Sequence, residues 1–228
     1  MGIIRMGVPE DTVLFIKESF AVRHFVETGT FNGHSSSWAS NHFAQVDTVE
    51  YSRALYDETK GKLGHIGNIN FIFGDSRAAL KEIVAEATLP ILFWLDAHWC
   101  SGGSYGEKDQ CPLLEELRII NSSPVEHYIL IDDARLFEAP PPLPNLTEFY
   151  PGLGDLLEVS KGMYLSVFED VIYILPKSKQ KDFSNFLQKK TTEAWVNYGK
   201  KQRQESLINR TRYTKTKHLV RTILKIWI

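Results

Sequence analysis

Acidic side chains recur where the buried strands of this chain are predicted to end. They are Glu27, Glu50, Asp75, Asp96 and the pair Asp132-Asp133. Ligands of open α/β sheets bind beyond the carboxyl ends of the strands, so we expect these acids to face one site. Carboxylates bind cations and hydroxyl groups and can accept protons. A single acid at such a place is often a helix cap or a solvated charge, but a series along successive strands indicates a binding site.

A glycine-containing turn follows the first acid and leads into a helix. Strand, glycine turn and helix form the entrance to nucleotide sites on such sheets. A carboxylate in place of the first glycine of the G-x-G-x-x-G fingerprint would repel a pyrophosphate. S-adenosylmethionine has a sulfonium and an ammonium group instead, so the pattern favours this cofactor; a turn without a ligand is the alternative. The residues predicted to bind the cofactor here are Glu27, Thr28, Gly29, Thr30, Gly33 and Ser35.

The later acids suit the remainder of such a cofactor. Glu50 follows Gly29 by 21 residues, close to the roughly 20 expected for a carboxylate that binds ribose hydroxyls. Asp75 and Ser76 are predicted to contact the adenine. Asp96, at the end of the fourth strand, completes the predicted cofactor set.

Three of the acids are also candidate metal ligands. Paired carboxylates repel each other, so a buried pair requires a cation or a raised pKa. Mg²⁺ takes oxygen ligands and keeps positions for substrate oxygens. We therefore predict Mg²⁺ bound by Asp96, Asp132 and Asp133. The alternative is that Asp133 caps the following turn and Asp132 alone faces the site.

His98 is the candidate general base, with Asp96 as its catalytic neighbour. A neutral imidazole can take a proton from a substrate hydroxyl; a histidine that only forms a hydrogen bond in its loop is the alternative. The glycine-rich segment 99–110 is predicted to close over a substrate. A zinc site of Asp96, His98, Cys100 and Cys111 is disfavoured because its spacing is loose and lacks a C-x-x-C pair.

The elements that position these residues alternate between strand and helix. After a leading helix over 9–20, strands are predicted at 24–27, 47–51, 70–75, 90–96 and 128–133, with helices between them. Continuous apolar runs are typical of parallel strands buried on both faces. Two more runs flank Glu169-Asp170 and predict a hairpin. The fold class is therefore α/β, a Rossmann-like sheet with helices on both faces.

Several segments resemble the class I S-adenosylmethionine-dependent methyltransferases. The pattern E-x-G-x-x-x-G at Glu27–Gly33 resembles their motif I. Further segments resemble poorly characterised bacterial members, over roughly residues 24–175: 95–99, 101–103, 106–109, 111–117 and 131–135. The resemblance implies five parallel strands plus a C-terminal hairpin, with S-adenosyl-L-methionine as cofactor. The acids 96, 132 and 133 also resemble the metal ligands of metal-dependent O-methyltransferases.

Composition and charge limit the remaining choices. With 43% hydrophobic and 24% charged residues, the chain has ordinary globular composition. No apolar run approaches a membrane span, no signal peptide is apparent and the two cysteines do not suggest a disulfide framework, so a cytoplasmic location is expected.

Charge is divided unevenly along the chain. Residues 1–176 contain 12 Lys/Arg and 25 Asp/Glu, whereas residues 177–228 contain 14 and 3. We predict a Rossmann-like domain over 1–176 and a basic helical extension over 177–228. The last residues, 218–228, predict a basic amphipathic helix that packs on its own domain or a twin subunit, or binds an anionic membrane surface or another partner. The acidic domain argues against nucleic acid as substrate.

These observations predict a methyltransferase that uses S-adenosyl-L-methionine and, with Mg²⁺, methylates a hydroxyl group of a small molecule or sugar. An NAD-linked oxidoreductase is the alternative enzyme, and the carboxylate of Glu27 counts against it. A non-catalytic cofactor-binding or interaction module is the alternative without chemistry.

Overall fold

The computed structural model describes residues 7–96, 111–138 and 151–226, of which 209–226 are described by their helical backbone alone. The chain divides into two compact units, Met1–Gln180 and Lys181–Ile228. This boundary lies four residues after the one predicted from charge. The two units are described separately below.

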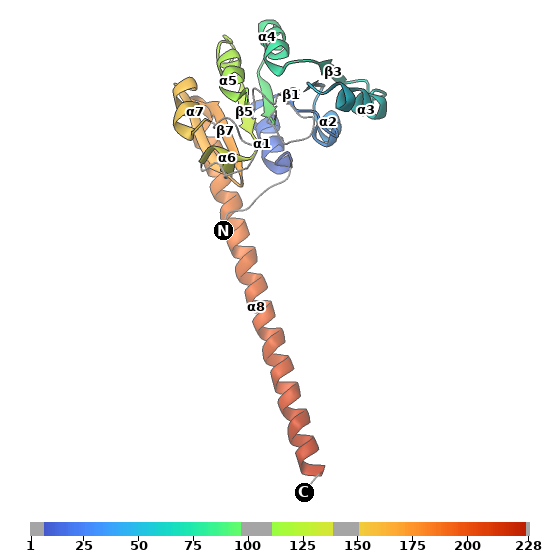
Figure 1. Ribbon diagram of the computed structural model, residues 1–228. Helices are drawn as coiled ribbons and strands as arrows, with labels where there is room; N and C mark the ends of the chain where they lie inside the picture. The colour runs from blue at the N-terminus through green and yellow to red at the C-terminus, as the bar shows by residue number, and fades with distance from the viewer. Residues whose placement is uncertain (1–6, 97–110, 139–150, 227–228) are drawn as a thin grey trace. The chain divides into compact units, whose positions relative to one another are not determined.

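The first unit contains a seven-stranded sheet (Figure 1). Its first five strands are parallel, β7 is antiparallel to β5, and β6 is antiparallel to β7. The predicted five parallel strands with a closing hairpin are confirmed. In spatial order the strands are β3 (Ile69–Phe73), β2 (Gln45–Glu50), β1 (His24–Thr28), β4 (Ile91–Leu95), β5 (Tyr128–Ile131), β7 (Val171–Pro176) and β6 (Met163–Phe168).

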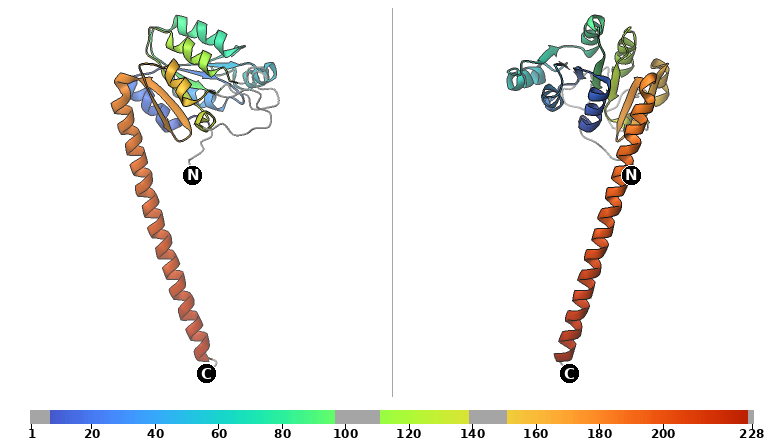
Figure 2. Two further views of the ribbon diagram at one scale, coloured as in Figure 1. Left: turned by 60° about the vertical axis from the view of Figure 1, so that its left-hand side comes forward. Right: turned by 180° about the vertical axis from the view of Figure 1, so that it is seen from behind.

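Helices cover both faces of this sheet (Figures 1 and 2). One face carries α1 (Glu10–Phe20), α2 (His34–Ser40) and α3 (Arg53–Leu63); the other carries α4 (Ser76–Glu86), α5 (Leu113–Asn121) and α7 (Leu153–Val159), while α6 (Ala134–Glu138) follows β5. Aromatic contacts fix the first layer: the ring of Phe20 stacks on Tyr128 with centroids 5.2 Å apart, and Phe25 meets Phe43 at 5.3 Å.

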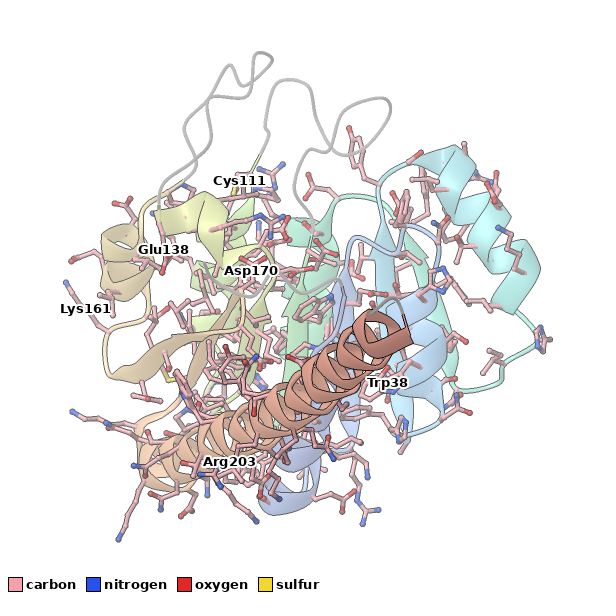
Figure 3. All side chains as sticks on the ribbon, turned by 90° about the horizontal axis from the view of Figure 1, so that it is seen from below. Trp38, Cys111, Glu138, Lys161, Asp170 and Arg203 are labelled. Atoms are coloured by element: carbon pink, nitrogen blue, oxygen red, sulfur yellow. The ribbon has the colours of Figure 1, made fainter. Side chains whose placement is uncertain are left out.

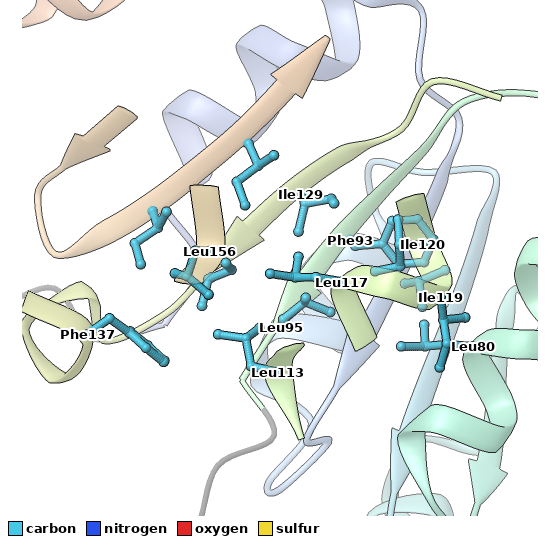
Figure 4. Close-up of a cluster of buried hydrophobic side chains, with 14 of the residues drawn as sticks. Leu80, Phe93, Leu95, Leu113, Leu117, Ile119, Ile120, Ile129, Phe137 and Leu156 are labelled. Atoms are coloured by element: carbon cyan, nitrogen blue, oxygen red, sulfur yellow. The ribbon is translucent and has the colours of Figure 1, made fainter. Parts of the chain in front are cut away.

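The main hydrophobic core lies between the sheet and α4, α5 and α7 (Figure 4). Phe93 and Ile129 project from the central strands, and Leu117 and Leu156 meet them from the helices; all four are fully buried. Burial of such a side chain contributes about 1.5–3 kcal/mol. Strands β4, β5 and β7 are buried along their whole length, whereas the edge strand β3 is only partly buried.

The carboxyl ends of the parallel strands meet at one edge of the sheet. There the backbone pairing continues past the strands: Asp96 N–H donates to the carbonyl of Thr28 at 3.1 Å, and Asp132 N–H donates to that of Leu95 at 3.2 Å. The backbone therefore places Asp96 next to the end of β1 and Asp132 next to the end of β4, at the carboxyl edge of the sheet.

The second unit consists of the rest of one long helix, α8 (Gln180–Ile226). The sequence suggested two helical segments here, but the helix is continuous over 47 residues. Among its exposed side chains are Trp195 and Tyr198, whose ring centroids lie 6.1 Å apart, and Arg203, which is labelled in Figure 3. In the part of the chain that the structure describes, no helix combines the length and apolar character needed to cross a membrane.

Candidate functional site

The glycine turn after β1 adopts a backbone that requires glycine at two positions. Gly29 has φ 87° and Gly33 has φ 70°, a region that side chains with a Cβ disfavour. A Cβ on Gly33 would also lie 2.6 Å from side-chain atoms of Thr59 and Leu63 in α3. The turn is fastened to β2, because the N–H groups of Gly29 and Thr30 donate to the carbonyl of Val49 at 3.0 and 3.3 Å.

Glu27 lies beneath this turn and is only 2% exposed. Its carboxylate accepts hydrogen bonds from the hydroxyls of Ser36 and of Thr48, the latter at 2.9 Å. Burial raises the pKa of Glu27 to about 7, although hydroxyls including that of Ser35 partly offset it and Glu50 adds to it. Glu27 therefore ties β1 to β2 and to the start of α2, and so fixes the shape of the turn.

Glu50 ends β2 beside the same turn, with 5% of its surface exposed. One carboxylate oxygen accepts the N–H of Phe31 at 3.0 Å, and the other accepts that of Ser52 at 2.7 Å. These two backbone donors hold the carboxylate in one orientation. Each oxygen can accept more than one hydrogen bond, so the group is able to bind a pair of neighbouring hydroxyls as well.

Asp75 and Ser76 stand at the start of α4. Asp75 caps this helix by accepting the N–H of Arg77 at 2.8 Å, and it pairs with the guanidinium group at 2.6 Å. This is the helix-cap role that single strand-end acids often have. Its predicted contact with adenine stays a prediction.

A buried carboxyl that was not predicted from the sequence lies beside Ser76. Glu116, on the inner face of α5, is 1% exposed. The side chains of Ser76 and Thr28, which are also buried, lie next to its carboxyl group. Burial raises the pKa of Glu116 to about 7, and the nearby hydroxyls of Ser76 and Thr28 lower it in part. Glu116 also lines, with Asp132, a cavity of about 10 Å³, which is room for about one water.

The three predicted metal ligands do not form one group. Asp132, which is buried, accepts the N–H of Asp133 at 2.8 Å. Asp133 has a left-handed backbone, with φ 56°, and pairs with Arg135 at 2.8 Å. Arg135 also pairs with Asp170 of the β6–β7 hairpin, which is labelled in Figure 3. Within residues 7–96, 111–138 and 151–226, no three His, Cys, Asp or Glu side chains are placed to hold a metal ion.

Other predicted elements lie outside the described residues. They are His98 and the loop 99–110 with Cys100. The role of His98 as general base therefore stays a prediction. Of the residues predicted for the cofactor, the structure gathers Glu27, Thr28, Gly29, Thr30, Gly33, Ser35 and Glu50 around the glycine turn and the ends of β1 and β2.

Comparison with solved structures identifies the fold. A methyltransferase of Podospora anserina with bound SAH superposes with a TM-score of 0.51 at 18% identity, over 75% of this chain and 80% of that one. A putative caffeoyl-CoA O-methyltransferase from Staphylococcus aureus gives a TM-score of 0.51 at 13% identity, over 75% and 86%. The chain has the class I methyltransferase fold. No family model and no curated protein matches its sequence.

This fold distinguishes between the predicted enzyme classes at the level of topology. A dinucleotide-binding sheet has the strand order 3-2-1-4-5-6, whereas here β7 enters between β5 and β6 and is antiparallel to both. The sheet therefore differs from that of an NAD-linked oxidoreductase at the edge beyond β5.

Two residues at the site were not predicted, although the sequence contains a signal for each. Thr48 stands two positions before Glu50, so it faces the same side of the sheet as Glu50 and meets Glu27. Glu116 stands between Leu113 and Ile120 on the apolar face of a helix, where a charged residue is unusual.

Proposed function

We propose that the chain binds S-adenosyl-L-methionine at the glycine turn and transfers its methyl group to a hydroxyl group of a small molecule or sugar. The observation that supports this most is the carboxylate of Glu50. It is held by the N–H groups of Phe31 and Ser52 beside a turn in which Gly29 and Gly33 have positive φ. A fixed carboxylate next to such a turn suits the ribose hydroxyls of a nucleoside.

The residues present fit this cofactor. Glu50 accepts hydrogen bonds from the ribose hydroxyls, and the turn from Gly29 to Gly33 lets the backbone approach closely. When bound, the cofactor supplies an electrophilic methyl group on a sulfonium, and the surrounding acids favour that positive charge.

The methyl acceptor is proposed to bind at the carboxyl ends of β4 and β5. A hydroxyl is a poor nucleophile until it loses its proton, so the acceptor needs a base within hydrogen-bond reach. Asp96 and Asp132, which the backbone pairs next to Thr28 and Leu95, are placed to orient the acceptor hydroxyl. His98 is the proposed base, two residues beyond Asp96.

The described residues do not fit the predicted Mg²⁺ site. Asp133 forms an ion pair with Arg135, and Arg135 forms a second ion pair with Asp170. A carboxylate engaged by a guanidinium group is a weaker candidate for a divalent cation, because binding the cation costs the ion pair.

Turnover with a panel of acceptors tests the proposal. Full-length protein is incubated with S-adenosyl-L-methionine and hydroxylated sugars, phenols or hydroxy acids, and release of the demethylated cofactor is measured by mass spectrometry. We expect release with at least one hydroxylated class, and a large loss in Glu50→Gln. Exposed Asp57, on α3, provides the control variant Asp57→Asn. Cofactor binding without turnover on any acceptor would instead support a non-catalytic binding module.

A further inference from the structure

A second cavity lies at the opposite edge of the sheet from the proposed cofactor site. Its volume is about 440 Å³, and it opens where β1, β2, β3 and β4 begin, beside the last turns of α4. This volume falls within the roughly 300–1,000 Å³ of small-molecule sites. Its lining includes none of the residues assigned above to the cofactor or the acceptor.

A buried carboxylate forms the polar floor of this cavity. Asp47 is 3% exposed, and its Oδ2 lies 2.7 Å from His24 Nε2 and 3.2 Å from Gln45 Nε2. Burial would raise the pKa of Asp47, but hydrogen bonds from His24, Asn70 and Gln45 and the charge of His24 outweigh it, so the pKa is lowered. The floor therefore keeps a negative charge.

Two further carboxylates stand at the rim, on the last two turns of α4. Glu82 and Glu86 are exposed and lie one turn apart. Neither has an ion pair among the described residues, and the last turn of α4 contains no basic residue. Like charges at this spacing repel each other, and acids at a helix C-terminus oppose the helix dipole. The arrangement therefore costs stability in the absence of a cation.

In contrast, two acids on helix α3 of the first unit form ion pairs. On α3, Asp57 pairs with Arg53 at 2.9 Å and Glu58 pairs with Lys62 at 2.5 Å, both at i,i+4 spacing. Glu82 and Glu86 of α4 have no such partner among the described residues. Departures from the local rules of stability are expected at functional sites.

The remaining lining favours an organic cation over a metal ion. Ile72, Ala79, Ile83 and the exposed Leu89 form apolar walls between the floor and the rim. Among the described residues, no three metal-ligating side chains converge, so the carboxylates suit charges that are separated in space. Arg23 and His24 are the basic residues of the lining, so the three carboxylates of Asp47, Glu82 and Glu86 outnumber them.

We propose that this cavity binds a linear aliphatic polyamine, with ammonium groups against Asp47 and against Glu82 and Glu86, and methylene groups along Ile72 and Ile83. Methylene stems bury well on apolar walls while their charged ends reach carboxylates. The site is at the amino edge of the sheet, so the inference does not rest on the proposed methyl transfer and can fail independently of it.

Calorimetric titration of the full chain with spermidine tests this inference. The titration is done at physiological ionic strength, because salt screens the nonspecific electrostatic attraction of spermidine to the acidic first unit. The test variant is the double substitution Glu82→Gln with Glu86→Gln; the matched control, Asp57→Asn with Glu58→Gln, removes the same charge from α3. We expect saturable binding that is weakened at least about tenfold in the test variant and changes less than about twofold in the control.

Thermal stability without spermidine gives a second readout. We expect the α4 variant to melt at a higher temperature than the unchanged chain, because it loses a repulsive pair, and the α3 variant to melt at the same or a lower temperature, because it loses two ion pairs. Absence of saturable binding, or equal weakening in both variants, would overturn the proposal. Equal melting shifts in both variants would also contradict it, because the acids of α4 would then carry no special cost.

Discussion

The buried carboxyl of Glu116 should make the stability of the first unit depend on pH. Its pKa rises from the ordinary 4.5 to about 7 in the folded chain. A carboxyl of this kind binds its proton more tightly when folded, so its contribution is fully present below pH 4.5 and is lost as pH rises to about 7. The total loss is about 3 kcal/mol, at 1.36 kcal/mol for each pKa unit.

Glu116→Gln keeps the shape of the side chain but removes this titration. Urea unfolding of the full chain at pH 5 and pH 8 measures the effect as a difference between the variant and the unchanged chain. We expect that difference to move by roughly 2–3 kcal/mol in favour of the variant as pH rises. The amide of the variant can itself lower the free energy of unfolding by an amount that does not depend on pH. This amount cancels, because the result is the change in the stability difference between pH 5 and pH 8.

Glu138→Gln is the control, since Glu138 is an exposed carboxyl at the end of α6 (Figure 3). Its substitution should leave the pH dependence unchanged within about 0.5 kcal/mol. Parallel stability curves for Glu116→Gln and the unchanged chain would refute the argument, because the carboxyl would then titrate alike in the folded and unfolded states.

Further predictions concern the cofactor, the metal and the basic helix. Glu50→Ala should weaken cofactor binding by about 1.5–3 kcal/mol in calorimetry, the usual loss for hydrogen bonds to a charged group; an unchanged affinity would exclude Glu50 from the ribose site. Turnover should persist in excess chelator, because Asp133 is paired with Arg135, and complete inhibition that Mg²⁺ reverses would restore the metal mechanism. Arg135→Met should lower the free energy of unfolding by about 1–3 kcal/mol, since it leaves the buried carboxylate of Asp170 unpaired; a smaller change in urea titration would show that water replaces the guanidinium group. The full chain should either form oligomers in analytical ultracentrifugation or sediment with anionic vesicles through α8, and failure of both would leave the basic helix without the partners predicted for it.

Much of the fold was predictable because its signals are local. Buried parallel strands give continuous apolar runs, and the acids that follow them mark the carboxyl edge of the sheet. The spacing from Gly29 to Glu50 likewise depends only on one strand–helix–strand unit. The hairpin was visible in the two runs that flank Glu169 and Asp170, both of which have positive φ.

The side-chain partners were less predictable because they come from distant parts of the chain. Asp133 was expected at a metal, but its partner Arg135 is also held by Asp170, 35 residues further along the chain. Glu27 was expected to face a ligand, but its carboxylate accepts a hydrogen bond from Thr48, 21 residues away on the neighbouring strand. Such pairings depend on strand register, which the apolar pattern alone does not specify.

Calorimetric titration of the full chain with S-adenosyl-L-methionine, its demethylated product and NAD is the most direct test of the central claim. The carboxylate of Glu50 beside the glycine turn predicts saturable one-to-one binding of the first two ligands. The antiparallel β7 between β5 and β6, which a dinucleotide-binding sheet lacks, predicts no binding of NAD. Tight binding of NAD together with no binding of either adenosyl ligand would contradict the account.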